Sequence, residues 1–243
     1  MNVLYCDNHV LVVLKPAGVP SQADESGDLD LLNQAKYYIK QKFNKPGEVF
    51  LGLVHRLDRP ASGLMVFART SKAASRLVSQ FKNRLVQKHY LAKVHGHPPD
   101  QARWQDYLLK KDRSVHVVGA DQGGQMAALK FESLSREAGT ELVKVELETG
   151  RPHQIRVQFA SRGFPLVGDV RYGSNIKLGN FLCLHAMALA FAHPTQPKTL
   201  LFQTPDLPNW VEDPTAVRTW LNRQVSEFHG HQLNSDPIWI KQN

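Results

Sequence analysis

One aspartate in this chain lies between two arginines, directly before a turn and a short apolar run. Pro60 and Ser62-Gly63 predict a tight turn, because proline fixes one backbone angle and glycine relaxes others. Residues 64–67 are continuously apolar, which indicates a strand buried on both faces. Asp58 is therefore expected on a loop braced by the core, and the arginines favour its ionised form. A structural role, capping the loop or pairing with a neighbouring arginine, is the alternative for a single aspartate.

Five further sequence blocks accompany this stretch in a fixed order and, with it, span most of residues 1–205. They are Lys15-Pro16-Ala17-Gly18, Lys88-His89-Tyr90-Leu91-Ala92 with Gly96, Thr149-Gly150-Arg151-Pro152-His153-Gln154-Ile155-Arg156, Gly168-Asp169 with Tyr172-Gly173, and Leu184-His185-Ala186. Together with His55-Arg56-Leu57-Asp58, these blocks resemble the RluA-type RNA pseudouridine synthases. The resemblance implies an α+β pseudouridine synthase fold, with a mixed, mainly antiparallel, bisected sheet, flanking helices and a central catalytic cleft.

Three positions depart from the family pattern. The threonine that usually precedes Ser-Gly is Ala61, the asparagine that often precedes Lys-Pro is Leu14, and the histidine that commonly follows the arginine of HQIR by two residues is Gln158. None of these positions carries a chemical role in the family. We expect these departures to affect the tuning of the site and the choice of substrate rather than the class of reaction.

The resemblance assigns catalytic roles to three residues. Asp58 falls on the catalytic aspartate of the family, and Arg156 on the arginine that pairs with it, so that a bidentate ion pair would keep the acid ionised and oriented. Tyr90 falls on the residue that stacks on the uracil, and its hydroxyl is a candidate for proton movement at C5. Without the resemblance, Tyr90 would be read as core packing and Arg156 as a solvated helix charge.

Five more residues are expected to bind the substrate. Arg56 corresponds to the arginine that fills the gap left by the displaced uridine, and Leu184 to an apolar residue lining the same pocket. Leu57, Ile155 and His55 complete this set, and hydrogen bonding that fixes the catalytic loop is the expected contribution of His55. The histidines show no spacing typical of a metal site.

Composition agrees with an enzyme that handles a polyanion. The chain has 243 residues, a formal net charge of +8 and an isoelectric point near 9.5. Such a charge attracts RNA, and the alternative explanation of the same excess is solubility alone. Cys6 and Cys183 are the only cysteines and lie far apart, so that neither a disulfide framework nor a zinc site is expected. A reducing cytoplasm is the expected location, without membrane association.

One catalytic domain is expected over residues 1–225, followed by a polar tail over 226–243 without an assignable pattern. The catalytic pattern begins at residue 3, so no RNA-binding module of the ribosomal-protein type is expected ahead of it. Strands are expected over 3–6, 10–14, 64–67, 88–94, 127–134, 141–147, 181–191 and 199–203. Helices are expected after caps at Asp28 and Ser71, from Pro152, and over 210–225, while residues 97–125 are expected to form strands joined by long surface loops.

The expected function is the isomerisation of uridine to pseudouridine in structured RNA, either transfer or ribosomal, with the target base flipped out of its stack. The reaction has no redox change, so no cofactor and no metal are expected, and neither is an obligate protein partner; a monomer is the default. The alternative is a catalytically silent RNA-binding or ribosome-assembly factor with the same fold. A carboxylate-dependent glycosidase or phosphodiesterase is a weaker option, because it needs a second acid or metal ligands that Asp169 supplies poorly.

Overall fold

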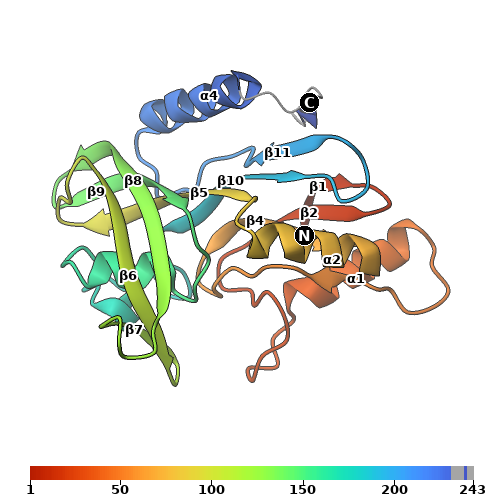
Figure 1. Cartoon of the computed structure of the whole chain (residues 1–243), viewed down its shortest axis with the longest axis horizontal. Coiled ribbons are helices and arrows are strands. Elements are labelled where there is room, and N and C mark those ends of the chain that lie inside the picture. Colours follow the sequence, from red (N-terminus) through yellow and green to blue (C-terminus); the bar gives the residue numbers. More distant parts are fainter. Residues whose placement is uncertain (231–237, 240–243) are drawn as a thin grey trace. The chain divides into compact units, whose positions relative to one another are not determined.

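The computed structural model describes residues 1–230 and 238–239 (Figure 1). The chain forms two compact units. Of the described residues, the first contains 1–86, 188–205, 227–230 and 238–239, and the second contains 87–187 and 206–226. Within the described ranges, no helix combines the length and the apolar character needed to cross a membrane.

The first unit opens on the predicted hairpin. Asp7 shapes its turn, because Oδ1 of Asp7 accepts hydrogen bonds from the backbone N–H groups of His9 (2.7 Å) and Val10 (2.8 Å). The strand order in this unit is β1-β2-β4-β10, with β3 paired to β4, β11 to β10 and β12 to β11. The strands are β1 (Asn2–Cys6), β2 (Val10–Lys15), β3 (Gly52–Leu53), β4 (Ser62–Ala68), β10 (Leu184–Ala192), β11 (Thr199–Gln203) and β12 (Ile238–Trp239).

Two helices of the first unit begin at caps other than those predicted. Helix α1 (Leu31–Lys42) is capped by Asp30, whose side chain accepts from the N–H of Asn33, so the predicted cap Asp28 is wrong. Helix α2 (Ser71–Lys82) is capped by Thr70 in the same way, one residue before the predicted Ser71. In each case the residue directly before the first helical turn has the extended backbone that a cap requires.

The apolar core of the first unit lies between its sheet and α2. The predicted strand 64–67 is confirmed as the buried centre of β4, which is antiparallel to β2. The same faces of these strands meet the helix positions Ala73 and Leu77. The core side chains are Val10, Val12, Leu64, Val66, Ala68, Ala73, Leu77, Val86, Leu189, Phe191, Leu200 and Phe202.

The second unit is built on a sheet with the order β10-β5-β9-β8-β6-β7, to which β10 contributes its residues 184–187. The pairs β5–β9, β9–β8, β8–β6 and β6–β7 are antiparallel. Its strands are β5 (Gln87–His95), β6 (Gln101–Lys111), β7 (Ser114–Val118), β8 (Gln125–Glu137) and β9 (Thr140–Leu147), so that the predicted hairpin over 127–134 and 141–147 is confirmed. The expectation of long loops within 97–125 is wrong. A two-residue turn joins β6 to β7, and Asp112 supplies the left-handed backbone (φ 51°) that it needs.

The C-terminal half of the chain adds the remaining helices. Helix α3 (Gln154–Ala160) starts two residues after the predicted Pro152, because His153 adopts a left-handed φ of 51°. A 3₁₀ turn, η1 (Val170–Tyr172), follows, and α4 (Pro214–Gly230) is shifted toward the C-terminus relative to the predicted 210–225. Within the tail expected over 226–243, Ile238–Trp239 forms β12, parallel to β11, whereas residues 231–237 and 240–243 lie outside the described residues. The predicted α+β class and mainly antiparallel pairing are confirmed.

Candidate active site

Asp58 lies on the loop between β3 and β4 in the first unit. The predicted turn forms there, since the N–H of Ala61 donates to the carbonyl of Asp58 (3.0 Å). Asp58 is partly exposed, Leu57 before it is buried, and Arg56 is exposed. The loop thus offers solvent a carboxylate and a guanidinium group while its backbone is anchored in the protein.

One anchor acts at Leu57, the residue before the aspartate. The hydroxyl of Ser21 donates to the carbonyl of Leu57 (2.7 Å) and accepts from the N–H of Leu57 (3.2 Å). Ser21 is only 6% exposed, so these hydrogen bonds are shielded from water. A single side chain therefore satisfies both backbone polar groups of Leu57.

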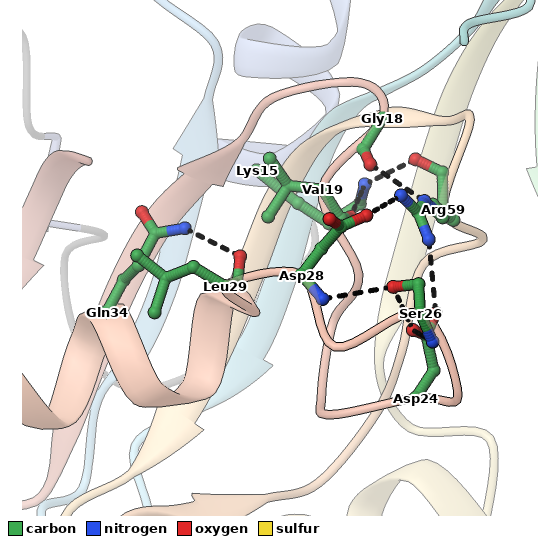
Figure 2. A network of polar contacts seen from close by, with 9 residues as sticks. All are labelled: Lys15, Gly18, Val19, Asp24, Ser26, Asp28, Leu29, Gln34 and Arg59. Atoms are coloured by element: carbon green, nitrogen blue, oxygen red, sulfur yellow. Dashed lines mark hydrogen bonds and ion pairs between the residues drawn. The ribbon is translucent and has the colours of Figure 1, made fainter.

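A second anchor acts at Arg59, the residue after the aspartate. Its carbonyl accepts from the N–H of Gly18 (2.8 Å) and from Nζ of Lys15 (3.0 Å). Lys15 is 1% exposed, and its Nζ also donates to the carbonyl of Val19 (2.8 Å) (Figure 2). The carbonyl of Pro16 accepts a third hydrogen bond from Nζ (3.0 Å). Burial lowers the pKa of Lys15 to about 7, against the opposing effect of the Asp58 charge. Asp58 thus lies between two residues that the segment 15–21 holds.

The side chain of Arg59 also contacts the segment that holds its backbone. Its Nε donates to the carbonyl of Gly18 (3.0 Å), and its guanidinium group forms ion pairs with Asp28 and with Asp24 (3.6 Å) (Figure 2). Asp24 also accepts from the N–H of Ser26 (3.0 Å). These contacts attach the polar loop over residues 24–28 to the loop that carries Asp58.

His55 connects the start of this loop to β4 and α2. Its Nε2 accepts from the N–H of Val66 (3.0 Å), which places the proton of the neutral ring on Nδ1. The ring stacks on Phe81 of α2, with centroids 4.7 Å apart and an interplanar angle of 18°. His55 therefore fixes the loop to the scaffold.

The remaining predicted site residues lie in the second unit. Tyr90 is on β5, with its Cα opposite that of Val145 on β9, and is 8% exposed. Ile155 on α3 and Leu184 at the start of β10 are 4% and 5% exposed. All three side chains are buried, and their role in enclosing a base stays a prediction.

Arg156 forms a buried bidentate ion pair with Asp169. Nε and Nη2 of Arg156 lie 2.7 and 2.8 Å from the two carboxylate oxygens of Asp169, and the guanidinium carbon lies 5.1 Å from the ring centroid of Tyr172. This bidentate geometry fixes the guanidinium plane. The expected pair between Arg156 and Asp58 joins residues of different units and stays a prediction.

His185 is buried in the second unit. Burial lowers the pKa of His185 to about 4, so that the ring is neutral at physiological pH. A neutral imidazole donates or accepts hydrogen bonds but carries no charge for the reaction. Its ionisation therefore has no place in a mechanism near pH 7.

Sequence reasoning missed the anchoring roles of Ser21 and Lys15 and the partner of Arg156. Lys15 and Asp169 stand inside conspicuous blocks, and a lysine in an apolar strand is itself a signal of a buried cation with dedicated acceptors. Ser21 follows a proline in a polar stretch and carries no such signal. Its role depends on a contact across 36 positions of the chain.

Comparison with known proteins places this architecture in one family. The model of the RNA pseudouridylate synthase family matches residues 9–161, more than half of the chain. Ribosomal large subunit pseudouridine synthase D of Zymomonas mobilis is 34% identical over 215 residues, which cover 83% of this chain and 68% of that protein. An uncharacterized RNA pseudouridine synthase of Aquifex aeolicus is 33% identical over 253 residues, covering 91% and 73% respectively.

Solved structures agree on the fold. Human RNA pseudouridylate synthase domain-containing protein 4 superposes with a TM-score of 0.73 at 24% identity, over 89% of this chain and 93% of that one. The fold and the family match together define a pseudouridine synthase domain. The chain belongs to the RNA pseudouridine synthase family and is an isomerase that acts on uridine in RNA.

Proposed function

We propose that this protein converts chosen uridines of structured RNA to pseudouridine with Asp58 as the catalytic carboxylate. The observation that carries the proposal is the placement of Asp58, a partly exposed acid between two residues whose backbone is anchored by Ser21, Lys15 and Gly18. Such anchoring is what a reacting group needs if it is to meet one carbon atom of a bound nucleotide.

The chemistry requires one ionised carboxylate beside the anomeric carbon. The N1 glycosidic bond breaks, the uracil rotates, and a new bond forms between C1′ and C5, after which C5 loses its proton. The carboxylate of Asp58 either attacks C1′ directly or removes a proton from the sugar. Both routes need the same ionised, immobile acid.

Base flipping brings the uridine to this acid. The exposed Arg56 is suited to occupy the gap that the uridine leaves, while Tyr90 offers a ring to the extruded uracil. The apolar side chains of Leu57, Ile155 and Leu184 would exclude water from the detached base. Arg156, whose guanidinium plane is fixed by the ion pair with Asp169, is assigned to pair with Asp58.

Ribosomal RNA is the substrate to test first. Relatives from Zymomonas mobilis, Buchnera aphidicola and Vibrio cholerae carry the name ribosomal large subunit pseudouridine synthase. Transfer RNA is the second substrate class, because loop shape decides between structured RNAs of similar charge.

The deciding experiment compares wild type with Asp58→Asn on RNA from cells that lack this gene. Asparagine keeps the shape of the side chain and removes its charge, so we expect pseudouridine formation, read by carbodiimide labelling and primer extension, to fall at least about 1,000-fold. RNA affinity and thermal unfolding should match wild type. The control is Asp206→Asn, which removes the charge of an exposed aspartate elsewhere.

Turnover by Asp58→Asn at the wild-type rate would refute the role of Asp58. RNA binding by wild type without pseudouridine in any RNA would instead support the catalytically silent alternative. The two outcomes differ in whether wild type itself reacts.

A further inference from the structure

The outer face of α2 carries positive charge without a compensating acid. From Arg59 to Pro99 the sequence holds eight lysines and arginines and no aspartate or glutamate, although the whole chain has 30 of the former and 22 of the latter. Lys72, Arg76 and Lys82 of α2, and Arg84 just after it, are all exposed. The overall charge excess of the chain is therefore concentrated here.

These cations differ in their pairing from three cations on the sheet of the second unit. Among residues 1–230 and 238–239, no carboxylate pairs with Lys72, Lys82 or Arg84, and Arg76 donates to the carbonyl of Pro194 (2.6 Å). On the sheet of the second unit, by contrast, Arg103 and Lys130 pair with Glu148, and Lys144 pairs with Glu132. Charges left without partners on a folded surface are available to an anion.

The helix is rigidly attached beneath this face. Ala73 and Leu77 are fully buried in the core of the first unit. Gly52 of β3 lies so close to the helix that an added Cβ would approach Cβ of Ala74 to 2.9 Å. The outer side chains are therefore presented from a fixed backbone.

The C-terminal end of α2 adjoins the loop that carries Asp58. Phe81 stacks on His55, which lies three positions before Asp58 in the sequence. Lys82 and Arg84 are one and three positions after Phe81. From Lys72 to Lys82 the helix spans about 15 Å at 1.5 Å per residue. An elongated anion that reaches the Asp58 loop from this side would lie along the row of cations.

We infer that the outer face of α2 binds the sugar–phosphate backbone of the RNA that carries the target uridine, at nucleotides flanking the reacting one. The inference rests on the proposed function. The exposed hydroxyls of Ser71, Ser75 and Ser79 alternate with the cations and are suited to donate to phosphate oxygens. A surface of lysines, arginines and serines without acidic residues binds phosphate groups. Such a surface positions the RNA but does not recognise its base sequence.

The test measures how RNA affinity depends on salt for Lys72→Gln/Lys82→Gln/Arg84→Asn. Asparagine is chosen at residue 84 because φ there is 60°, a left-handed backbone that asparagine tolerates. Each lost phosphate contact lowers the slope of log affinity against log salt by about 0.7 to 0.9, so we expect the slope to fall by about 2 to 3. The rate of pseudouridine formation at saturating RNA should stay at the wild-type value.

The control is Arg103→Gln/Lys130→Gln/Lys144→Gln, which removes the same charge from cations that are already paired. We expect its salt slope to stay within about 0.5 of wild type. Equal losses in the two triple variants would overturn the inference, because only net charge would then matter, and so would an unchanged slope in the α2 variant.

Binding is measured in an Asp58→Asn background as well as in wild type, so the slope does not depend on catalysis. If wild type forms no pseudouridine, the proposed function fails while the salt slope still reports on the α2 face. Thermal unfolding checks that both triple variants are folded. A drop in slope without loss of the folded state supports the inference.

Discussion

At the scale of single residues, the hydroxyl of Ser21 controls the backbone beside the candidate catalytic acid. Ser21→Ala removes the partner of both polar groups of buried Leu57, and we expect it to cost on the order of 1 to 3 kcal/mol of stability. The displaced Asp58 should slow single-turnover pseudouridine formation by about ten- to a hundredfold, with unchanged RNA affinity. Ser21→Thr, which keeps a hydroxyl, should recover much of the rate.

Thr70→Ala is the matched control for this effect. It removes the capping hydrogen bond of α2 beyond the opposite end of β4, at a comparable cost of about 1 kcal/mol. We expect it to lower the melting temperature without slowing the reaction below that temperature. A rate loss in Thr70→Ala as large as in Ser21→Ala would show that activity follows stability alone.

Residues of the candidate site could be predicted only where their type and sequence neighbours indicate a chemical role. An aspartate between arginines before a turn is conspicuous, and its loop position was predicted correctly from the sequence. Asp169 was judged a poor second acid, and the structure gives it a partner in Arg156 instead. A serine hydroxyl that bridges the backbone of a distant loop has no local pattern, because its partners are set by the fold.

At the scale of elements, β2 ends in a buried cation whose titration should be visible in stability. Burial lowers the pKa of Lys15 from 10.5 to about 7, so between these values the unfolded chain holds a proton that the folded chain has released. The free energy of unfolding should therefore rise with pH across this window, by about 1.4 kcal/mol per pH unit. Lys15→Met lacks this group and should lack the slope.

Urea unfolding of both proteins from pH 6 to pH 9 measures this difference. We expect the wild-type free energy minus that of Lys15→Met to be level below pH 7 and to climb above it. A difference that stays constant over the whole range would mean that Lys15 keeps its proton. The three backbone carbonyls around Nζ would then outweigh the effect of burial.

Element boundaries were harder to predict than the elements themselves. Asp28 and Asp30 both qualify as caps by type, and Asp28 is taken instead by the ion pair with Arg59. The start of α3 depended on the left-handed backbone of His153, which residue preferences do not predict. At Gln158, where the family commonly has histidine, the side-chain amide donates to Asp106 (2.7 Å), which links α3 to β6.

At the scale of the whole molecule, the family resemblance predicted the α+β class, and hydrophobic patterns predicted most strands. The antiparallel hairpins of both units follow from local patterns, since their partners are close in sequence. The division into two units, each assembled from separate parts of the chain, does not follow from such patterns, because it depends on long-range pairing.

The reaction assigned to the whole protein needs no external group. Isomerisation conserves every atom and involves no redox change, so we expect wild-type pseudouridine formation to proceed at full rate in excess EDTA without added nucleotide. Magnesium enters only through RNA folding, and a pre-folded short stem–loop substrate removes that dependence. Loss of activity in EDTA on such a substrate, restored by one divalent ion, would contradict the assigned chemistry.

The attachment of one short segment to both sides of Asp58 has a consequence for chain length. Lys15 reaches the carbonyl of Arg59, while Ser21 reaches the backbone of Leu57. The five residues between these two side chains set the distance between the two contacts that flank Asp58. Adding or deleting a residue there would detach one contact whenever the other formed, so the length of this segment matters to the position of Asp58 as well as its composition.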